Sequence, residues 1–459
     1  MRFQTAAIAL TLFGALGAVT TACATRTDGE PAPPSGFFSG TQPDSIDPTL
    51  AQAADAGSDA STGPVGTAWQ VGIGRPTPVL HKLYTEHLGE WLRDEPTHSA
   101  SFGLLGADIG LSLRQFGQQV FFFGDSFAAN PAMENTKTVA TIPLGPPPDV
   151  LDLPKLVFPL DSTGVFTPVS LPGLSFGPLT VPWGSIALGN STYVYYAAAW
   201  DPTTQTQTQS ALAHTQNGAF TSMQLDYDVP STHFIGVQAL EAGDDVLLFG
   251  EGPYRQSALY LATVPKKQIA NHSAWRYFAG QGDAGCPTFS SSEADAVPII
   301  PSDCIGEFSV MRSFELGGYV VTYNCFDTNE RGIFMQMAPT PLGPWSAPVK
   351  ILDPEFDSYT KFIHANPQVI GFDDGLSDWG RETTFGFEYA PNLVPEWTRA
   401  LSPGVFSIVY TLSSWNPYTL HLVHTVVGVD GTSASPTPRG VGLPKATLVN
   451  GDFGTGDLT

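Results

Sequence analysis

Residues 120–127 read Val-Phe-Phe-Phe-Gly-Asp-Ser-Phe, an aromatic, apolar run that stops at a glycine and an aspartate. Aromatic and β-branched residues favour strands, and Gly and Asp favour the turns that end them. The pattern therefore predicts a short strand followed by a turn. Five further runs of this kind lie at 193–197 (YVYYA), 246–250 (VLLFG), 319–323 (YVVTY), 383–387 (TTFGF) and 405–410 (VFSIVY).

The spacing of these runs indicates the architecture. The first five start about 50 to 75 residues apart, which suits four-stranded units joined by variable loops. Second strands follow three of the runs, at 258–263, 332–337 and 420–427. Grouping the last two runs gives about five units, and five such sheets arranged radially form an all-β, five-bladed β-propeller. A jelly roll or sandwich is the alternative, but it usually needs fewer than the roughly 330 residues spanned here.

Composition supports a strand-rich domain. The 459 residues include 47 Gly and 40 Pro, and only 14% are charged, which argues against a helical bundle or coiled coil. The 43 Asp and Glu outnumber the 20 Lys and Arg, so the net charge is −23 and a nucleic acid is not an expected partner. Residues 81–93 carry Leu83, Leu88 and Trp91 at helical spacing. They predict one short helix or a lead-in segment.

The ends of the chain resemble targeting and linker sequences. Residues 1–23 contain Arg2, a short apolar run and then Thr-Ala-Cys, as in a bacterial lipoprotein signal that ends at a lipidated Cys23. This predicts an exported protein, held on a membrane surface by lipid or, if an ordinary signal peptide is cut nearby, secreted. Residues 24–67 read as a disordered linker, 68–428 as the propeller domain, and 429–459 as a polar tail. The tail ends either as the start of a truncated carbohydrate-binding module or as a disordered segment.

Cysteine use agrees with export. Beyond Cys23, the chain contains Cys286, Cys304 and Cys325. We expect a disulfide between Cys286 and Cys304, which would contribute about 3 kcal/mol by closing a polar loop. Pairing of Cys304 with Cys325 is the alternative. No two cysteines have the close spacing of zinc ligands, so no metal or other cofactor is expected.

Carboxylates beside glycines are the candidate catalytic groups, because nucleophile-elbow, P-loop and zinc-protease motifs are missing from the sequence. Asp108 lies in 106–110 (GADIG), and Asp125 follows the 120–124 strand. Two carboxylates in one pocket meet the requirement of glycoside hydrolysis for a proton donor and a nucleophile or base. The alternative is that both aspartates cap turns.

Other residues are candidates for supporting roles. Glu307 lies in a strand after the expected disulfide loop and is a third candidate catalytic carboxylate. Asp373, Asp374 and Asp378 crowd one loop that could hold calcium, although a solvated acidic loop is the simpler interpretation. Candidate substrate-binding residues are Trp183, Trp200, Tyr254, Arg255 and His364.

Several motifs between about residue 100 and residue 427 resemble one bacterial family. That family was long described only as a domain of unknown function, DUF4185, and is now grouped as glycoside hydrolase family 183, the endo-D-arabinanases. GADIG with FGDSF is the most specific part of the resemblance. The matching stretches, in order, are GADIG, FFFGDSF, VLLFGEG with Arg255, ALYLATVP, IGEFSV, YVVTYN and PLGPWSAP.

The resemblance implies a five-bladed propeller that cleaves internal α-linked D-arabinofuranosyl bonds in mycobacterial-type arabinogalactan and lipoarabinomannan. It places the catalytic aspartates at Asp108 and Asp125 and puts Glu307 in the pocket. A Pro-rich insertion at 142–179 departs from the family pattern and is expected to alter the subsites without touching the carboxylates. We therefore expect a monomeric, exported glycoside hydrolase with a polysaccharide substrate. A non-catalytic cell-surface propeller that binds glycan or protein is the alternative.

Overall fold

The computed structural model describes residues 76–93, 96–150, 152–282, 286–327, 330–366, 374–376 and 384–430. The expected signal sequence with Cys23, the 24–67 linker, Asp373, Asp378 and the tail beyond Asp430 lie outside the described residues. Within the described part, no helix is long and apolar enough to cross a membrane.

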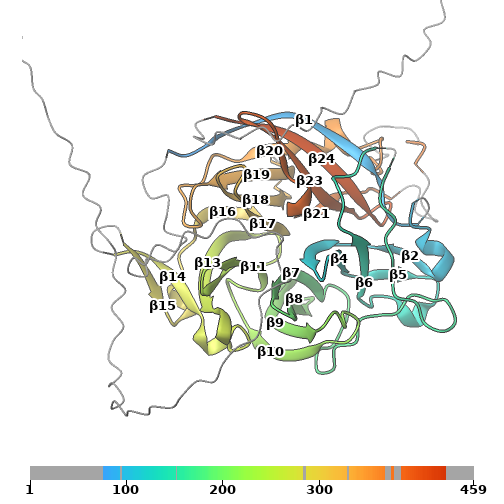
Figure 1. The fold of residues 1–459 in the computed structure, drawn as a ribbon, viewed down its shortest axis with the longest axis horizontal. Coiled ribbons are helices and arrows are strands. Elements are labelled where there is room, and N and C mark those ends of the chain that lie inside the picture. The colour runs from blue at the N-terminus through green and yellow to red at the C-terminus, as the bar shows by residue number, and fades with distance from the viewer. Residues whose placement is uncertain are drawn as a thin grey trace, which may run out of the picture.

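Five sheets surround a central axis, as Figure 1 shows. Their innermost strands contact one another in turn around that axis. The protein is therefore an all-β, five-bladed β-propeller, as the sequence predicted. The inner strands are β3 (Leu111–Gln115), β7 (Val181–Leu188), β11 (Gly236–Ala242), β17 (Phe308–Ser313) and β21 (Glu388–Leu393).

The second, third and fourth blades are each built from antiparallel strands that follow one another in the sequence. The first blade adds β4 (Gln118–Phe123) and β6 (Thr138–Pro143) to β3, and the same part of the chain forms a separate two-stranded sheet from β2 (Leu104–Ala107) and β5 (Ser126–Ala128). The second adds β8 (Ser191–Asp201), β9 (Thr206–Gln216) and β10 (Gln224–Pro230) to β7. The third adds β12 (Asp245–Glu251), β13 (Ser257–Pro265), β14 (Arg276–Gln281), β15 (Pro287–Ser290) and β16 (Ile300–Ile305) to β11. The fourth adds β18 (Gly318–Cys325), β19 (Gly332–Ala338) and β20 (Val349–Leu352) to β17.

The fifth blade joins the two ends of the propeller. It contains β21, β22 (Arg399–Ser402), β23 (Val405–Ser414), β24 (Thr419–Asp430) and, at its outer edge, β1 (Val79–Glu90). The described helical turns are short: η1 (Ser99–Phe102), η2 (Pro131–Met133), η3 (Lys266–Gln268), η4 (His272–Ala274), η6 (Glu293–Asp295), the π-turn η7 (Pro354–Ser358) and η8 (Pro395–Trp397).

The helix predicted for 81–93 is wrong, because β1 occupies most of that segment. β1 pairs antiparallel with β24 from Val79 opposite Asp430 to Glu90 opposite His421, with two register shifts. The N-terminal strand thereby covers the last blade's edge and closes the ring (Figure 1). Pairing with a distant strand satisfies the backbone more completely than an isolated helical turn does, so tertiary context overrides the local spacing of leucines.

Most of the predicted strand runs are strands, but one is displaced. The runs at 120–124, 193–197, 246–250, 319–323 and 405–410 fall on β4, β8, β12, β18 and β23. The described part of the 383–387 run is not a strand, and β21 starts at Glu388. The backbone of this run is bonded to loops instead, since Gly386 N–H donates to His364 O and Phe387 O accepts from Trp415 N–H.

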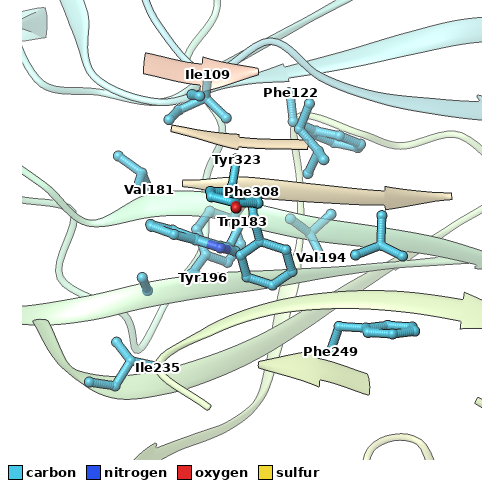
Figure 2. Close-up of a cluster of buried hydrophobic side chains, with 14 of the residues drawn as sticks. Ile109, Phe122, Val181, Trp183, Val194, Tyr196, Ile235, Phe249, Phe308 and Tyr323 are labelled. Carbon is cyan, nitrogen blue, oxygen red and sulfur yellow. The ribbon is translucent and has the colours of Figure 1, made fainter. Parts of the chain in front are cut away.

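The apolar faces of neighbouring blades pack together around the axis (Figure 2). Trp183 lies on β7 in this core and is only 4% exposed. Its indole packs against Gly236 of the next blade, where a Cβ would overlap the ring. The expectation that Trp183 contacts substrate is therefore wrong, because blade packing buries its ring.

A disulfide links the third and fourth blades. It joins Cys304 of β16 to Cys325 of β18, whose Cα atoms lie 5.1 Å apart. The expected pairing of Cys286 with Cys304 is therefore wrong, and the alternative partner is the right one. β16 lies against β18 in space, so the fold brings these two sulfurs together.

Candidate active site

A cavity of about 240 Å³ lies among the loops and strand ends of all five blades and is lined by three carboxylates, Asp108, Asp125 and Glu307. Asp108 follows β2, Asp125 connects β4 with β5, and Glu307 precedes β17. The structure thus brings together all three carboxylates that the sequence marked as catalytic candidates. Tyr254 and Arg255, expected to bind substrate, also line this cavity.

Backbone conformation explains why glycines flank the two aspartates. Ile109 and Gly110 both have positive φ angles, 71° and 61°, which turn the chain sharply after Asp108. The Gly110 and Gly124 N–H groups each donate to the Asp108 carbonyl at 3.0 Å. A Cβ at position 124 would overlap Oδ1 of Asp108, so only glycine lets this carboxyl group lie against the start of the Asp125 turn.

Asp108 is buried, with 7% of its surface exposed. Tyr389 donates a hydrogen bond of 3.0 Å to its Oδ2, whereas Oδ1 has no hydrogen-bond partner among the described residues. Burial and the nearby charge of Asp125 raise the pKa of Asp108 to about 7, against the hydrogen bond from Tyr389, which acts to lower it. Asp108 can therefore hold a proton near neutral pH.

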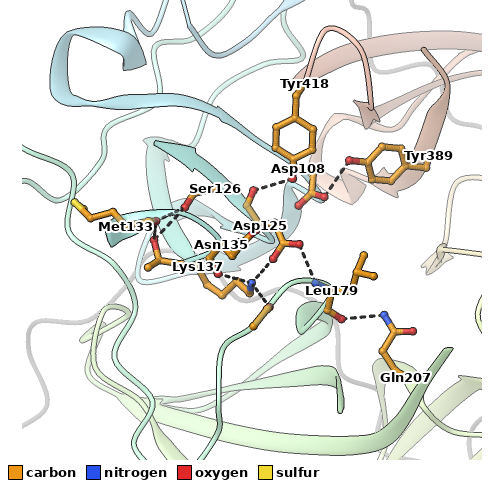
Figure 3. Close-up of polar contacts among 12 residues, drawn as sticks. Asp108, Asp125, Ser126, Met133, Asn135, Lys137, Leu179, Gln207, Tyr389 and Tyr418 are labelled. Carbon is orange, nitrogen blue, oxygen red and sulfur yellow. Dashed lines mark hydrogen bonds and ion pairs between the residues drawn. The ribbon is translucent and has the colours of Figure 1, made fainter. Parts of the chain in front are cut away.

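Asp125 lies among donors (Figure 3). Lys137, only 1% exposed, forms an ion pair with its Oδ1, and the Leu179 N–H donates to its Oδ2 at 2.9 Å. The lysine is itself fixed by a 2.7 Å hydrogen bond to the Asn135 carbonyl. Tyr418 donates to the backbone carbonyl of Asp125 at 2.9 Å. Both oxygens of this carboxylate are therefore held in place, and one of the donors carries a full charge.

The Pro-rich insertion contributes directly to this arrangement. Leu179 lies at its end, and the Gly177 carbonyl accepts a 3.3 Å hydrogen bond from Lys137. The expectation that the insertion leaves the carboxylates untouched is therefore wrong. Its backbone supplies a donor to Asp125 and an acceptor to the lysine that pairs with Asp125.

Glu307 is paired with Arg255 in a two-point contact, with NH2 to Oε1 at 2.7 Å and Nε to Oε2 at 3.0 Å. Tyr254 also donates to Oε1 at 3.0 Å. Burial acts to raise the pKa of Glu307, but the Arg255 guanidinium holds it below its usual range. Behind this pair, burial and then the charge of Glu307 raise the pKa of Glu251 well above its usual value. Glu307 is therefore the charged carboxylate of this wall.

Two further candidates lie away from the cavity lining. His364 is 1% exposed, and its Nδ1 lies 3.0 Å from Oδ1 of Asp374. The fold buries the histidine against its carboxylate partner, Asp374, and outside the cavity lining, so its expected contact with substrate stays a prediction. Trp200 packs its edge against Tyr254, with ring centroids 5.6 Å apart, and supports the cavity wall.

The structure adds site residues that the sequence analysis missed. Tyr389, Trp415 and Tyr418 line the cavity from the fifth blade, far along the chain from Asp108. The sequence around these three residues does not distinguish them from other aromatic residues, because aromatic residues occur on most strands of this protein. Lys137 had one usable signal: it is a lone cation next to the apolar β6, in a chain with only 20 Lys and Arg.

The sequence matches one known protein family. The family model described as "Domain of unknown function (DUF4185)" matches residues 175–424. The chain belongs to this family. The matched region covers the second to fifth blades up to β24, and therefore includes Glu307, Arg255 and the aromatic wall, whereas Asp108 and Asp125 precede it. No curated protein matches the chain significantly.

Solved structures resemble the chain only distantly. A Bacteroides ovatus protein aligns with 15% identity and a TM-score of 0.47 over 72% of this chain and 88% of its own. An exo-β-1,3-galactanase from Phanerochaete chrysosporium aligns with 10% identity and a TM-score of 0.41 over 76% and 64%. A family 117 glycoside hydrolase from Zobellia galactanivorans aligns with 12% identity and a TM-score of 0.40 over 76% and 91%. Similarity at this level assigns no activity to the DUF4185 protein.

Proposed function

We propose that this DUF4185 protein is an exported glycoside hydrolase that cleaves internal D-arabinofuranosyl linkages of mycobacterial-type cell-wall arabinan. The observation that carries the hydrolase proposal is the pair Asp108 and Asp125, which line one cavity in contrasting surroundings. The arabinan substrate is supported by the resemblance of the GADIG and FGDSF motifs to endo-D-arabinanases. Lipidation of Cys23 would hold the enzyme at a membrane surface, where a cell-wall polymer is accessible.

The surroundings of the two aspartates suit different roles. Asp108, with its pKa raised to about 7 and its Oδ1 without a protein partner among the described residues, is the proton donor to the departing glycosidic oxygen. Asp125, fixed by Lys137 and the Leu179 N–H, acts as the carboxylate at the anomeric carbon. It either attacks this carbon or removes a proton from the attacking water molecule. Asp108 gives its proton to the leaving group in either route. If Asp125 attacks, Asp108 takes a proton from the water molecule that then cleaves the glycosyl–Asp125 bond. If water attacks directly, Asp125 takes the proton of that water, and exchange with solvent returns both carboxyl groups to their starting states.

The rest of the cavity fits a sugar ring. Tyr254, Phe387 and Trp415 provide aromatic faces, while Glu307 and Arg255 provide a fixed pair of charged groups. Aromatic rings pack against the C–H faces of sugars, and charged groups orient their hydroxyls. Because Arg255 holds Glu307 charged, we assign Glu307 to substrate positioning rather than to proton donation.

The test is incubation of the purified protein with mycobacterial D-arabinan. We expect oligosaccharides of several lengths, and the anomeric form of the first products, measured by NMR, distinguishes attack by Asp125 from attack by water. Asp108→Asn and Asp125→Asn should each lower turnover by roughly 10²–10⁴-fold. Asp152→Asn, at an exposed carboxylate that does not line the cavity, is the control and should not.

Two outcomes would contradict the proposal. Intact arabinan after incubation with the wild-type protein would exclude this activity, and binding without cleavage would favour the non-catalytic glycan-binding propeller. Near wild-type activity in either aspartate variant would show that the catalytic pair is wrongly assigned.

A further inference from the structure

A second cavity, of about 620 Å³, adjoins the one that holds the three carboxylates. Four residues line both cavities: Asp125, Leu179, Trp415 and Tyr418. The two volumes therefore form one cleft with two lobes that meet at Asp125. We call the larger lobe, lined by the residues of the 620 Å³ cavity, the outer lobe. Its volume falls within the roughly 300–1,000 Å³ typical of ligand sites.

Trp415 forms the aromatic wall shared by the lobes. It follows β23, and its N–H donates to the Phe387 carbonyl at 2.9 Å. The indole stacks on the Phe387 ring, with centroids 6.0 Å apart and planes 13° apart. The Tyr418 ring lies nearly perpendicular to the indole, with centroids 5.9 Å apart. Despite these contacts, 42% of Trp415 is exposed. A tryptophan that is held by its neighbours yet remains 42% exposed at a cavity wall is suited to stack on a ligand.

Polar groups line the same lobe. Asn135 has a left-handed backbone, φ 59°, fixed by its N–H bond to the Ser126 carbonyl at 2.9 Å and by Lys137 on its own carbonyl. The amide of its side chain makes no hydrogen bond to the described residues. Glu134 beside it is exposed. The lobe therefore combines aromatic rings with a neutral amide and carboxylates, the set of groups that recognises a polyhydroxylated ring.

We propose that the outer lobe is an additional sugar subsite, an inference that rests on the proposed function. The glycan lies through both lobes, with the scissile linkage at Asp125. The next arabinofuranosyl unit stacks on the exposed part of the Trp415 indole and accepts or donates hydrogen bonds at Asn135 and Glu134. Occupation of both lobes explains how a chain can be cut internally, because the cleft continues on both sides of Asp125.

Binding of D-arabino-oligosaccharides to the Asp108→Asn protein tests this subsite without turnover. We expect calorimetric affinity to increase with chain length until both lobes are filled. Adding Trp415→Ala should weaken binding of the longest oligosaccharide by about 10-fold and remove the dependence on length, whereas Trp415→Phe should restore most of the affinity. Phe314→Ala is the matched control, because Phe314 is an aromatic residue 82% exposed and does not line the cleft.

The outcomes separate the subsite from the activity. Equal affinity with and without the Trp415 side chain would overturn the subsite, and so would failure of every oligosaccharide to bind. Trp415-dependent binding supports the subsite even if the wild-type protein leaves arabinan intact, in which case only the proposed hydrolysis fails. Loss of affinity in Phe314→Ala as large as in Trp415→Ala would also overturn it.

Discussion

The substitution Asp108→Asn should stabilise the protein while it abolishes the proposed activity. Asn has nearly the shape of Asp and can still accept the hydrogen bond from Tyr389, but it cannot ionise. In the wild-type protein, the carboxyl group of Asp108 is buried beside the charge of Asp125, so its ionisation costs free energy in the folded state. The variant removes that cost and keeps the packing.

The sign and size of this change in stability follow from the pKa of Asp108. Folding raises the pKa of Asp108 from 3.8 to about 7, so the native state binds this proton more tightly than the unfolded chain does. The contribution to stability is therefore fully present below pH 3.8 and is lost as the pH rises through about 7. At about 1.4 kcal/mol per pH unit, the full loss is of order 4 kcal/mol. The variant should gain about 2–4 kcal/mol over the wild type at pH 8 and almost nothing near pH 4.

The assay is denaturant unfolding of both proteins between pH 4 and pH 8, followed by tryptophan fluorescence. Asp152→Asn controls for loss of one negative charge, because that carboxylate is exposed. The expected result is a difference in unfolding free energy that grows with pH for position 108 and stays flat for position 152. A variant that is less stable than the wild type at pH 8, or a difference independent of pH, would refute the reasoning.

Two other predictions concern the supports of the site. Lys137→Met leaves Asp125 without its buried cationic partner. The unfolding free energy should fall by about 3–5 kcal/mol, and turnover on arabinan should fall with it. Unchanged stability and activity would show that the ion pair is dispensable. Replacing Cys304 and Cys325 together with serine opens a link across 21 residues and should cost about 3 kcal/mol, measured as a lower thermal midpoint. A reducing agent should lower the midpoint of the wild type more than that of the double variant, and equal sensitivity of both would contradict this.

The sequence by itself was sufficient for the class of fold and for the aspartate motifs. Runs such as 120–124 and 246–250 became strands because aromatic and β-branched residues favour a pleated backbone wherever turns bound them. GADIG and FGDSF were recognisable because glycine is needed where Asp108 lies against Gly124. The helix expected at 81–93 failed for the opposite reason: the free edge of β24, more than 300 residues away in sequence, determines that this segment is a strand.

Only the tertiary structure decided how the carboxylates differ. The pKa of Asp108 depends on burial and on Asp125, and Tyr389, which bonds to it, lies 281 positions along the chain. Lys137 and the Leu179 N–H reach Asp125 because the first blade and the insertion after it fold back on each other. The partner of Cys304 was likewise set by which strands lie side by side. Electrostatic interactions and disulfide pairing depend on distance in space, and sequence separation does not report that distance.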